Sequence, residues 1–309
     1  MENKKKNRII ETYKYQSLLG EGSYGKVYLV RANLSKKYYA MKTIDINLLN
    51  ENQKKEALQE ARILKKLDHP NIIKLKEVFI AKKPKETLNI ITEYADGEDL
   101  SKKIKKQIQE KKYFPEDQIL DWFTQICLAV YYIQKNKILH RDIKPQNVFL
   151  TKSSMVKLGD FGISKNLNTT WEKAVTFIGT PYYISPEIVQ NQPYSFKSDI
   201  WSLGVLLYEL VSLKYPFDAS SLPKLMIKIM KGQYSKLSNK NYSTDIKNLI
   251  YHLLDVDPSK RPDIKSILDL PIMKNRMTLL LKEVEYDKNF SEKVIQDFVN
   301  FIFLIYFRF

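Results

Sequence analysis

The first part of the chain has the pattern of a β-sheet. Apolar and polar residues alternate along Tyr13–Ile44, with apolar positions that include Val27, Leu29 and Ala40. This alternation is the period of half-buried strands. A further strand is predicted over Leu88–Thr92. The chain is therefore expected to begin with a sheet of several strands.

Helical periodicity interrupts these strands once and dominates the second half of the chain. A helix is predicted over Gln53–Leu67, because Ala57, Ala61 and Leu64 recur at helical spacing. Further helices are predicted over Lys102–Lys112, Ile119–Ile133, Asp199–Leu210 and Asp245–Leu254. Asp199–Leu210 is apolar nearly all round, so we expect it at the centre of a helical unit.

Length and composition add four limits. The 309 residues are enough for two lobes with a real core. A single cysteine, Cys127, excludes a disulfide framework and suits a reducing compartment. The charged start, MENKKKNR, is followed by no apolar run and is not a secretory signal. The net charge of +16 could indicate nucleic acid or membrane, but the lysines are spread along the chain without a nucleic-acid-binding motif.

A polar run at the centre of the chain carries the candidate chemistry. In Leu139–Leu150, LHRDIKPQNVFL, three functional side chains stand at short spacing: Asp142, Lys144 and Asn147. They offer a general base, a cation for phosphate and a neutral metal ligand. The flanking segments Ile138-Leu139 and Val148-Phe149-Leu150 are predicted to be buried β segments. Taken alone, the run could also be a satisfied polar turn.

A second acidic residue follows in the sequence Asp160-Phe161-Gly162. It comes directly after a strand predicted around Val156 and Leu158. The spacing between Asp142 and Asp160 leaves room for a hairpin that returns Asp160 beside Asn147. Asp160 and Asn147 would then offer hard oxygen ligands of the kind that Mg²⁺ prefers.

A glycine-rich loop lies among the first strands. Gly20, Gly22 and Gly25 form a G-x-G-x-x-G pattern, which also occurs in dinucleotide-binding folds. That fingerprint requires a helix after the loop, whereas a strand follows here, so the pattern predicts a β-hairpin. Glycine allows the backbone of such a hairpin to approach phosphate oxygens without a Cβ clash.

A lysine and a glutamate complete the candidate site. Glu60 falls on the apolar stripe of the helix predicted over Gln53–Leu67, and a carboxylate that faces a core is costly unless it is paired. Lys42, at the end of a predicted strand, is the partner that we expect. The alternative is a glutamate at the edge of the stripe that reaches water.

In this order, the motifs resemble those of the eukaryotic protein kinases. The resemblance covers Tyr13–Leu270, and Lys144 with Thr180 match the serine/threonine pattern. Four segments are similar in sequence to the NIMA-related (Nek) branch in particular: HRDIKPQNVFL, VKLGDFGISK, IGTPYYISPEI and YSFKSDIWSLGVLLYEL. That branch implies work in cell division, at microtubule-organising centres or in cilia.

The resemblance implies an α+β, bilobal kinase fold with a small, mostly-β N-lobe that carries one key helix, and a larger, mostly-α C-lobe. Residues 1–12 would be a basic tail, 13–270 the kinase domain (N-lobe 13–95, C-lobe 96–270), and 271–309 a short C-terminal segment with an apolar end. The apolar run Phe301–Phe307 is far shorter than the roughly 20 residues that a membrane-spanning helix needs.

The resemblance also assigns roles in the binding of ATP and Mg²⁺. The catalytic residues would be Asp142, Lys144, Lys42 and Glu60. The metal ligands would be Asn147 and Asp160. The nucleotide would be bound by Leu19, Gly20, Glu21, Gly22, Ser23, Tyr24, Gly25, Val27, Ala40, Lys42, Thr92, Glu93, Ala95 and Phe149.

Regulation is expected in the long loop Ile163–Tyr183, which is too long for a compact domain unless it is functional. The resemblance places an activating phosphate on Thr176, with Arg141 as its receptor and Lys165 as a second cation. It further implies that Asp199 tethers the backbone of the catalytic loop and that Arg261 pairs with Glu187.

The expected partners are ATP and protein substrates with Ser or Thr acceptors. No specific nucleic acid and no membrane span are expected, and the chain is expected to be a cytoplasmic monomer, with the cytoskeleton, the centrosome or basal body and the cilium as candidate sites. Two alternatives stay open: a kinase-fold scaffold without catalysis, and a basic module that binds microtubules or nucleic acid.

Overall fold

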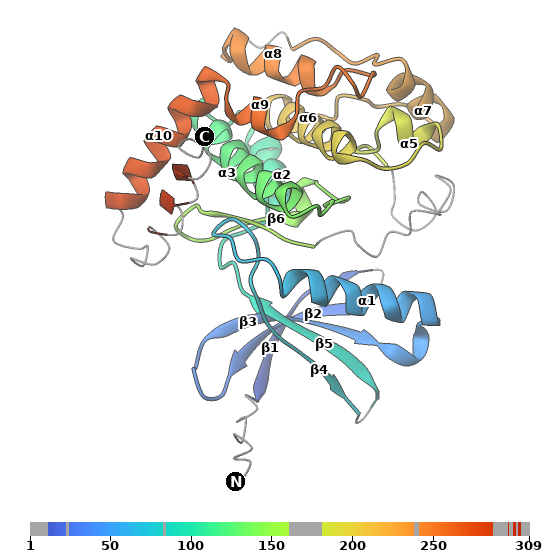
Figure 1. The fold of residues 1–309 in the computed structure, drawn as a ribbon, viewed down its shortest axis with the longest axis vertical. Coiled ribbons are helices and arrows are strands. Elements are labelled where there is room, and N and C mark those ends of the chain that lie inside the picture. Colours follow the sequence, from blue (N-terminus) through green and yellow to red (C-terminus); the bar gives the residue numbers. More distant parts are fainter. Residues whose placement is uncertain are drawn as a thin grey trace. The chain divides into compact units, whose positions relative to one another are not determined.

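The computed structural model of the chain describes residues 12–22, 25–82, 85–160, 181–237 and 241–286, with 296, 299–300 and 302–303. The chain divides into two compact units. The first comprises Met1–Lys65 and Lys74–Tyr94, and the second comprises Lys66–Ile73 and Ala95–Phe309. A sheet with one α-helix forms the first unit and the second is mostly helical (Figure 1), which confirms the predicted α+β kinase fold class.

The first unit is built on a five-stranded sheet in the order β1-β2-β3-β5-β4. Its strands are β1 (Tyr13–Gly22), β2 (Gly25–Ala32), β3 (Tyr38–Asp45), β4 (Leu75–Ala81) and β5 (Thr87–Glu93). Every neighbouring pair is antiparallel. The predicted hairpin is confirmed, because Gly22 pairs with Gly25 across β1 and β2.

One helix, α1 (Glu51–Leu64), covers a face of this sheet after the short 3-10 turn η1 (Ile46–Leu48). Asn50 Oδ1 accepts a hydrogen bond from Gln53 N at 2.9 Å, and Gln53 Oε1 accepts one from Asn50 N at 3.0 Å. This reciprocal capping box satisfies two backbone donors at the start of the helix. The predicted stripe of Ala57 and Ala61 is buried against the sheet. Its partners there are Ile44, Leu88 and Ile90.

The second unit contains helices around one central helix. They are α2 (Leu100–Glu110), α3 (Glu116–Lys135), α5 (Pro186–Val189), α6 (Phe196–Ser212), α7 (Leu222–Met230), α8 (Thr244–Leu253), α9 (Ile264–Leu268) and α10 (Pro271–Tyr286). Every residue of α6 from Ser198 to Val211 is buried, and α6 packs against α3 and α8 (Figure 1). The prediction of a buried helix at the centre of this unit is therefore confirmed. No helix in the described parts of the chain has the length and apolarity needed to cross a bilayer.

The run Leu139–Leu150, called the catalytic loop after the resemblance to protein kinases, ends in the predicted β segment but is not preceded by one. Val148–Leu150 forms strand β6 after the 3-10 turn η2 (Pro145–Asn147) and pairs antiparallel with β7 (Val156–Leu158), as expected. The predicted β segment at Ile138-Leu139 is wrong. There the N–H of Ile138 donates to the carbonyl of Ile133 at 2.9 Å, after Lys137 has turned into the left-handed region with φ 60°. Ile138 therefore completes the end of α3 instead of joining a sheet, and Leu139 follows it outside any strand.

A short segment before β4, Lys66–Ile73, belongs to the second unit, although in the sequence it lies between elements of the first unit. Ile72 forms a parallel bridge with Leu158, and the N–H of Ile73 donates to the carbonyl of Leu158 at 2.8 Å. Asn71 is completely buried and donates from Nδ2 to Gln125 Oε1 at 2.9 Å. These contacts attach the segment to β7 and α3.

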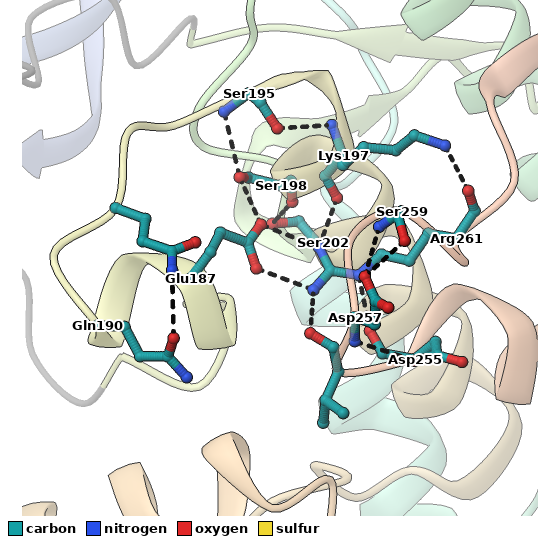
Figure 2. A network of polar contacts seen from close by, with 12 residues as sticks. Glu187, Gln190, Ser195, Lys197, Ser198, Ser202, Asp255, Asp257, Ser259 and Arg261 are labelled. Carbon is teal, nitrogen blue, oxygen red and sulfur yellow. Dashed lines mark hydrogen bonds and ion pairs between the residues drawn. The ribbon is translucent and has the colours of Figure 1, made fainter.

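A buried ion pair joins the segment after the long loop to the end of the domain (Figure 2). Arg261 donates from its two terminal nitrogens to the two carboxylate oxygens of Glu187, at 2.9 Å and 2.8 Å. The Arg261 side chain is 0% exposed and that of Glu187 is 4% exposed. The expected pairing of these residues is confirmed.

Further donors and acceptors complete this network. Ser198 Oγ donates to Glu187 Oε1 at 2.7 Å, and Arg261 also donates to the carbonyls of Lys197 and Asp255. The guanidinium lies over the ring of Trp201, 4.9 Å from its centroid. Burial alone would raise the pKa of Glu187, but the hydrogen bonds from Arg261 and Ser198 outweigh it and hold that pKa below its usual value.

We predict that Arg261→Ala destabilises the protein by about 3–5 kcal/mol, because the carboxylate of Glu187 would stay buried without its guanidinium. The matched control is Lys265→Ala, which removes an exposed ion pair with Asp269 and should leave the midpoint of unfolding nearly unchanged, because water screens such a pair. The measurement is the urea midpoint of unfolding, followed by tryptophan fluorescence. Similar midpoints for the two variants would contradict a structural role for the buried pair.

Candidate functional site

One carboxylate in the first turn of α6 binds the backbone of the catalytic loop. Asp199 is completely buried, and it accepts hydrogen bonds from the backbone N–H of His140 at 3.1 Å and of Arg141 at 3.0 Å. The hydroxyl of Tyr194 adds a third at 2.7 Å. Burial raises the pKa of Asp199 above its usual value, although these three donors oppose the rise. The expected tether between Asp199 and the loop is confirmed.

Three predicted side chains meet within this loop. Lys144 Nζ lies 2.9 Å from Asp142 Oδ2, and both side chains are largely shielded, with 25% and 18% exposed. Asn147 Nδ2 donates to the same Oδ2 at 2.9 Å and to the carbonyl of Asp142 at 2.8 Å. A carboxylate is thus oriented by a cation and an amide, which suits a group that must face a substrate hydroxyl.

Asp160 returns to this cluster through the β6–β7 hairpin. Its carbonyl lies 3.5 Å from Asn147 Nδ2, and the N–H of Gly159 donates to the carbonyl of Asn147 at 3.0 Å. A side chain at Gly159 would not fit, because a Cβ there would lie 2.9 Å from Ile73 Cγ1 and 3.0 Å from a ring atom of Phe149. Gly159 thus packs closely against Ile73 and Phe149, and the next residue, Asp160, is exposed.

Asn147 and Asp160 fit the requirements of Mg²⁺. Among the described residues, Asn147 makes its side-chain hydrogen bonds through Nδ2, so Oδ1 is the atom that it can offer to a cation. The exposed carboxylate of Asp160 supplies a second hard oxygen donor. Mg²⁺ is commonly held by one or two such protein groups together with phosphate oxygens.

In the first unit, the strand register brings four predicted nucleotide residues to one face of the sheet. Val27 pairs with Lys42 across β2 and β3, and Ala40 pairs with Thr92 across β3 and β5. Residues that are paired or two apart along a strand share a face. This is the face that α1 covers, because Ile90, which pairs with Lys42, packs against α1.

In the glycine-rich loop, Gly25 is a glycine that a larger residue could not replace. Gly25 has φ 153°, and a Cβ there would lie 2.1 Å from the carbonyl oxygen of Thr43 on β3. Glu21 and Lys26 pair across the hairpin, and Lys26 Nζ lies 3.5 Å from Glu21 Oε1. Ser23 and Tyr24, at the tip, lie outside the described residues. Leu19 and Gly20 precede the tip on β1.

The other predicted residues are distributed over both units. Glu93 ends β5 in the first unit, where its Oε1 accepts a hydrogen bond from the N–H of Lys74 at 2.8 Å. Ala95 and Phe149 belong to the second unit. Glu60 lies in α1, but its side chain falls outside what the structure describes. The expected pair of Glu60 with Lys42 therefore stays a prediction.

The regulatory prediction falls on a part of the chain that is largely outside the described residues. Thr176 and Lys165 lie within 161–180, which the structure does not describe, as do Phe161 and Thr180. Arg141 is described, is half-buried and has a left-handed backbone with φ 68°.

Sequence reasoning missed one acidic residue, Glu209, which contacts Tyr183 at the end of the long loop. Glu209 in α6 is 8% exposed and accepts a hydrogen bond from the hydroxyl of Tyr183. Tyr183 lies edge-on to Tyr215, and Tyr182 stacks on Tyr215 with centroids 3.9 Å apart. Burial raises the pKa of Glu209 to about 7, and the hydrogen bond from Tyr183 only partly opposes it. The available signal was a glutamate that follows a run of apolar residues in this helix, Leu203–Leu207.

The raised pKa of Glu209 predicts a pH dependence of stability. The folded protein holds this proton more tightly than the unfolded chain, so the contribution is full below about pH 4.5 and is lost as the pH rises through about 7. Relative to Glu209→Gln, which keeps an acceptor for Tyr183, the unfolding free energy of the wild type should fall by about 3 kcal/mol over that range. Urea titrations at several pH values measure the difference, and a constant difference would contradict the prediction.

Comparisons with known proteins identify the family of this chain. Residues 13–273 match the family model of the protein kinase domain. The chain is 43% identical to Serine/threonine-protein kinase Nek1 of Mus musculus, over 94% of this chain and 24% of that protein. It is 42% identical to Serine/threonine-protein kinase Nek5 of Homo sapiens, over 93% of this chain and 40% of that protein.

A third relative, Serine/threonine-protein kinase Nek3 of Mus musculus, is 45% identical over 84% of this chain and 49% of that protein. The chain thus spans about a quarter to a half of the length of these relatives, between 24% and 49%. The family match covers most of the chain, and the relatives confirm the resemblance to NIMA-related kinases. This chain belongs to the protein kinase domain family, in its NIMA-related branch.

Proposed function

We propose that this protein is a serine/threonine protein kinase, which transfers the γ-phosphoryl group of ATP to Ser or Thr hydroxyls of proteins. The observation that carries the proposal is the set of contacts around Asp142. Its carboxylate is held by Lys144 at 2.9 Å and by Asn147 at 2.9 Å, with Asp160 next to Asn147. A base, a cation and two oxygen donors in one cluster match the needs of phosphoryl transfer.

Within this cluster, Asp142 orients the acceptor hydroxyl and accepts its proton. Lys144 stands beside that carboxylate and neutralises charge on the γ-phosphoryl group. Asn147 and Asp160 would hold Mg²⁺, which would neutralise charge at the phosphates when bound. These roles are supported by the position of the four side chains on one loop and the hairpin that follows it. The backbone N–H groups of His140 and Arg141 in that loop donate to Asp199 of α6.

The nucleotide is assigned to the residues that the resemblance to protein kinases names. Gly20, Gly22 and Gly25 let the backbone of the β1–β2 hairpin approach the phosphates, and Lys42, paired with Glu60, contacts the α- and β-phosphates. Val27, Ala40 and Phe149 flank the adenine. Thr92 is the gatekeeper, and the main-chain groups of Glu93 and Ala95 meet the adenine edge.

The biological setting follows from the relatives alone. Their printed names describe serine/threonine kinases of the Nek group. We propose the same acceptor chemistry for this chain, with a role in the cell cycle, at microtubules or at the cilium. A cytoplasmic monomer with access to the cytoskeleton is the form that we propose.

We predict that Asp142→Asn lowers the rate of phosphoryl transfer by about 10²–10⁴-fold, the usual contribution of a general base. ATP affinity should stay nearly unchanged, because Asp142 is assigned to the acceptor and not to the nucleotide. Lys42→Met should instead weaken the productive positioning of ATP. Radiolabel transfer to a protein substrate measures the rate, and calorimetry measures ATP binding.

The matched control is Asp245→Asn, an equally conservative change at an exposed position in the first turn of α8. It should leave both measurements unchanged. Turnover of Asp142→Asn above a few per cent of the wild-type rate would refute the assignment of Asp142 as the base.

We also propose that phosphorylation of Thr176, three residues before Gly179, activates the enzyme, with Arg141 as the main receptor and Lys165 as the second. A phosphate adds about −1.5 to −2 charges, which an arginine fork can bind bidentately. A charge-assisted hydrogen bond of about 1.5–3 kcal/mol corresponds to an effect of about tenfold or more.

Phosphatase treatment of the wild type should therefore lower its activity about tenfold or more. Thr176→Ala should match the treated protein without any treatment, and Arg141→Ala should make the activity insensitive to phosphatase. Mass spectrometry checks the phosphate at Thr176. Full activity of Thr176→Ala, equal to that of the phosphorylated wild type, would place the switch elsewhere.

A further inference from the structure

Helix α7 is fixed in the second unit by one of its sides. Leu225, Met226 and Ile229 are buried, with 1%, 4% and 0% of their surfaces exposed. These positions recur at helical spacing and form a single apolar stripe. The helix packs against α5 (Figure 1). Its orientation is therefore set, and the opposite side must face outward.

The outward side carries a row of lysines. Lys224, Ile227, Lys228 and Lys231, which we call the α7 row, follow one another at intervals of three and four residues and are all exposed. Side chains at this spacing lie next to one another on a helix. Three ammonium groups are thus presented along one edge of the second unit.

Among the described residues, no ion pair joins the lysines of the α7 row to a carboxylate, although Asp218 directly precedes this stretch and Asp255 and Asp257 flank Val256. Between Ala219 and Thr244 the sequence contains five lysines and no Asp or Glu. In the described part of the chain, Lys224 contacts Ser220 Oγ at 3.5 Å, and Lys228 donates to the carbonyl of Asp218 at 2.5 Å. Neither contact is with a carboxylate, and the row keeps its positive charge.

The lysine-rich helix α2 shows the opposite arrangement. Lys102 Nζ lies 3.5 Å from Asp99, and Lys103 Nζ lies 3.5 Å from Glu98. Lys106 Nζ lies 4.0 Å from Glu110. Three of the four lysines of α2 thus have a carboxylate within 4.0 Å, as expected of a solvated face, whereas the lysines of the α7 row have no such pair in the described part of the chain. Lysine content alone does not distinguish the two helices.

Apolar side chains accompany the lysines of α7. Ile227 is 46% exposed, Met230 37% and Val256 39%. Val256 lies at the end of the helix, because a Cβ on Gly232 would be 2.9 Å from Val256 Cγ1. The surface therefore combines cations with partly exposed aliphatic groups, as the contact surfaces of protein interfaces do.

We propose that this surface, made of the α7 row with Met230 and Val256, binds an acidic segment of a partner protein that also carries apolar side chains. Lys224 and Lys231 are about 10 Å apart along the helix axis. About three or four residues of an extended segment span that distance. Carboxylates on the partner pair with the lysines, and its apolar groups cover Ile227 and Met230.

A protein segment fits this surface better than the other anionic partners. A helix that inserts into a membrane surface needs a free apolar side, whereas that of α7 is buried inside the unit. Single-stranded nucleic acid is bound through aromatic side chains that stack on bases, and the proposed surface is made of lysine and aliphatic side chains. Charge and aliphatic contact together favour an acidic peptide.

The test is fluorescence anisotropy with the full 309-residue chain, without ATP. The probe is a labelled peptide of about twelve residues in which pairs of Glu alternate with single Leu, and the control peptide has Gln for Glu. We expect Lys224→Glu with Lys231→Glu to raise the Kd at least about tenfold, because attraction becomes repulsion. Ile227→Ser should weaken binding about fivefold through lost apolar contact.

The matched control is Lys105→Glu with Lys106→Glu on α2, which changes the net charge equally and should leave the Kd within about twofold of the wild-type value. Circular dichroism confirms that each variant is folded. An equal loss in the α2 variant would overturn the proposal, since binding would then follow net charge. Binding of phosphatidylserine vesicles or single-stranded DNA through the α7 lysines, without binding of the peptide, would also overturn it.

Discussion

The carboxylate of Asp199 lies completely buried in the first turn of α6 and is surrounded by three hydrogen-bond donors. A buried charge is costly unless such donors replace the lost water. Two of the donors are backbone N–H groups of the catalytic loop, at His140 and Arg141. Displacing the loop would leave the carboxylate uncompensated inside the core. The position of Asp142 is therefore coupled to the most buried helix of the molecule.

The same helix organises the segments on both sides of the long loop. Besides Asp199, it supplies the hydroxyl of Ser198 to the Glu187–Arg261 pair and the carboxylate of Glu209 to Tyr183. Each contact is directional and lies in a region of low exposure, where hydrogen bonds to charged groups are strong. The chain before residue 161 and the chain after residue 180 are consequently attached to one rigid element.

Charge is used differently at the two lysine-rich helices and in the catalytic cluster. Lys144 is held against Asp142, and three of the four α2 lysines have local carboxylates, so these charges are compensated within the protein. The lysines of the α7 row are not compensated in this way. The net charge of +16 is therefore a poor guide to binding. What matters is which cations lack an acidic neighbour within the few ångströms over which pairing is effective.

Local patterns determined much of this protein from the sequence alone. The alternation that includes Val27 and Ala40 predicted the sheet, the stripe of Ala57 and Ala61 predicted α1, and the spacing from Asp142 to Asn147 predicted the catalytic cluster. These features depend on residues a few positions apart, whose geometry the backbone period sets.

Only the tertiary structure decided the features that depend on distant neighbours. Ile138-Leu139 has the composition of a strand, but the backbone N–H of Ile138 bonds to the end of α3. In the sequence, Asn71 lies between elements of the first unit, and yet its side chain donates a hydrogen bond to Gln125 of α3 in the second unit. Glu209 and the lysines of α7 look like ordinary charged residues in the sequence. Whether such a charge is buried, paired or left uncompensated depends on which segments fold next to it, and no local period encodes that.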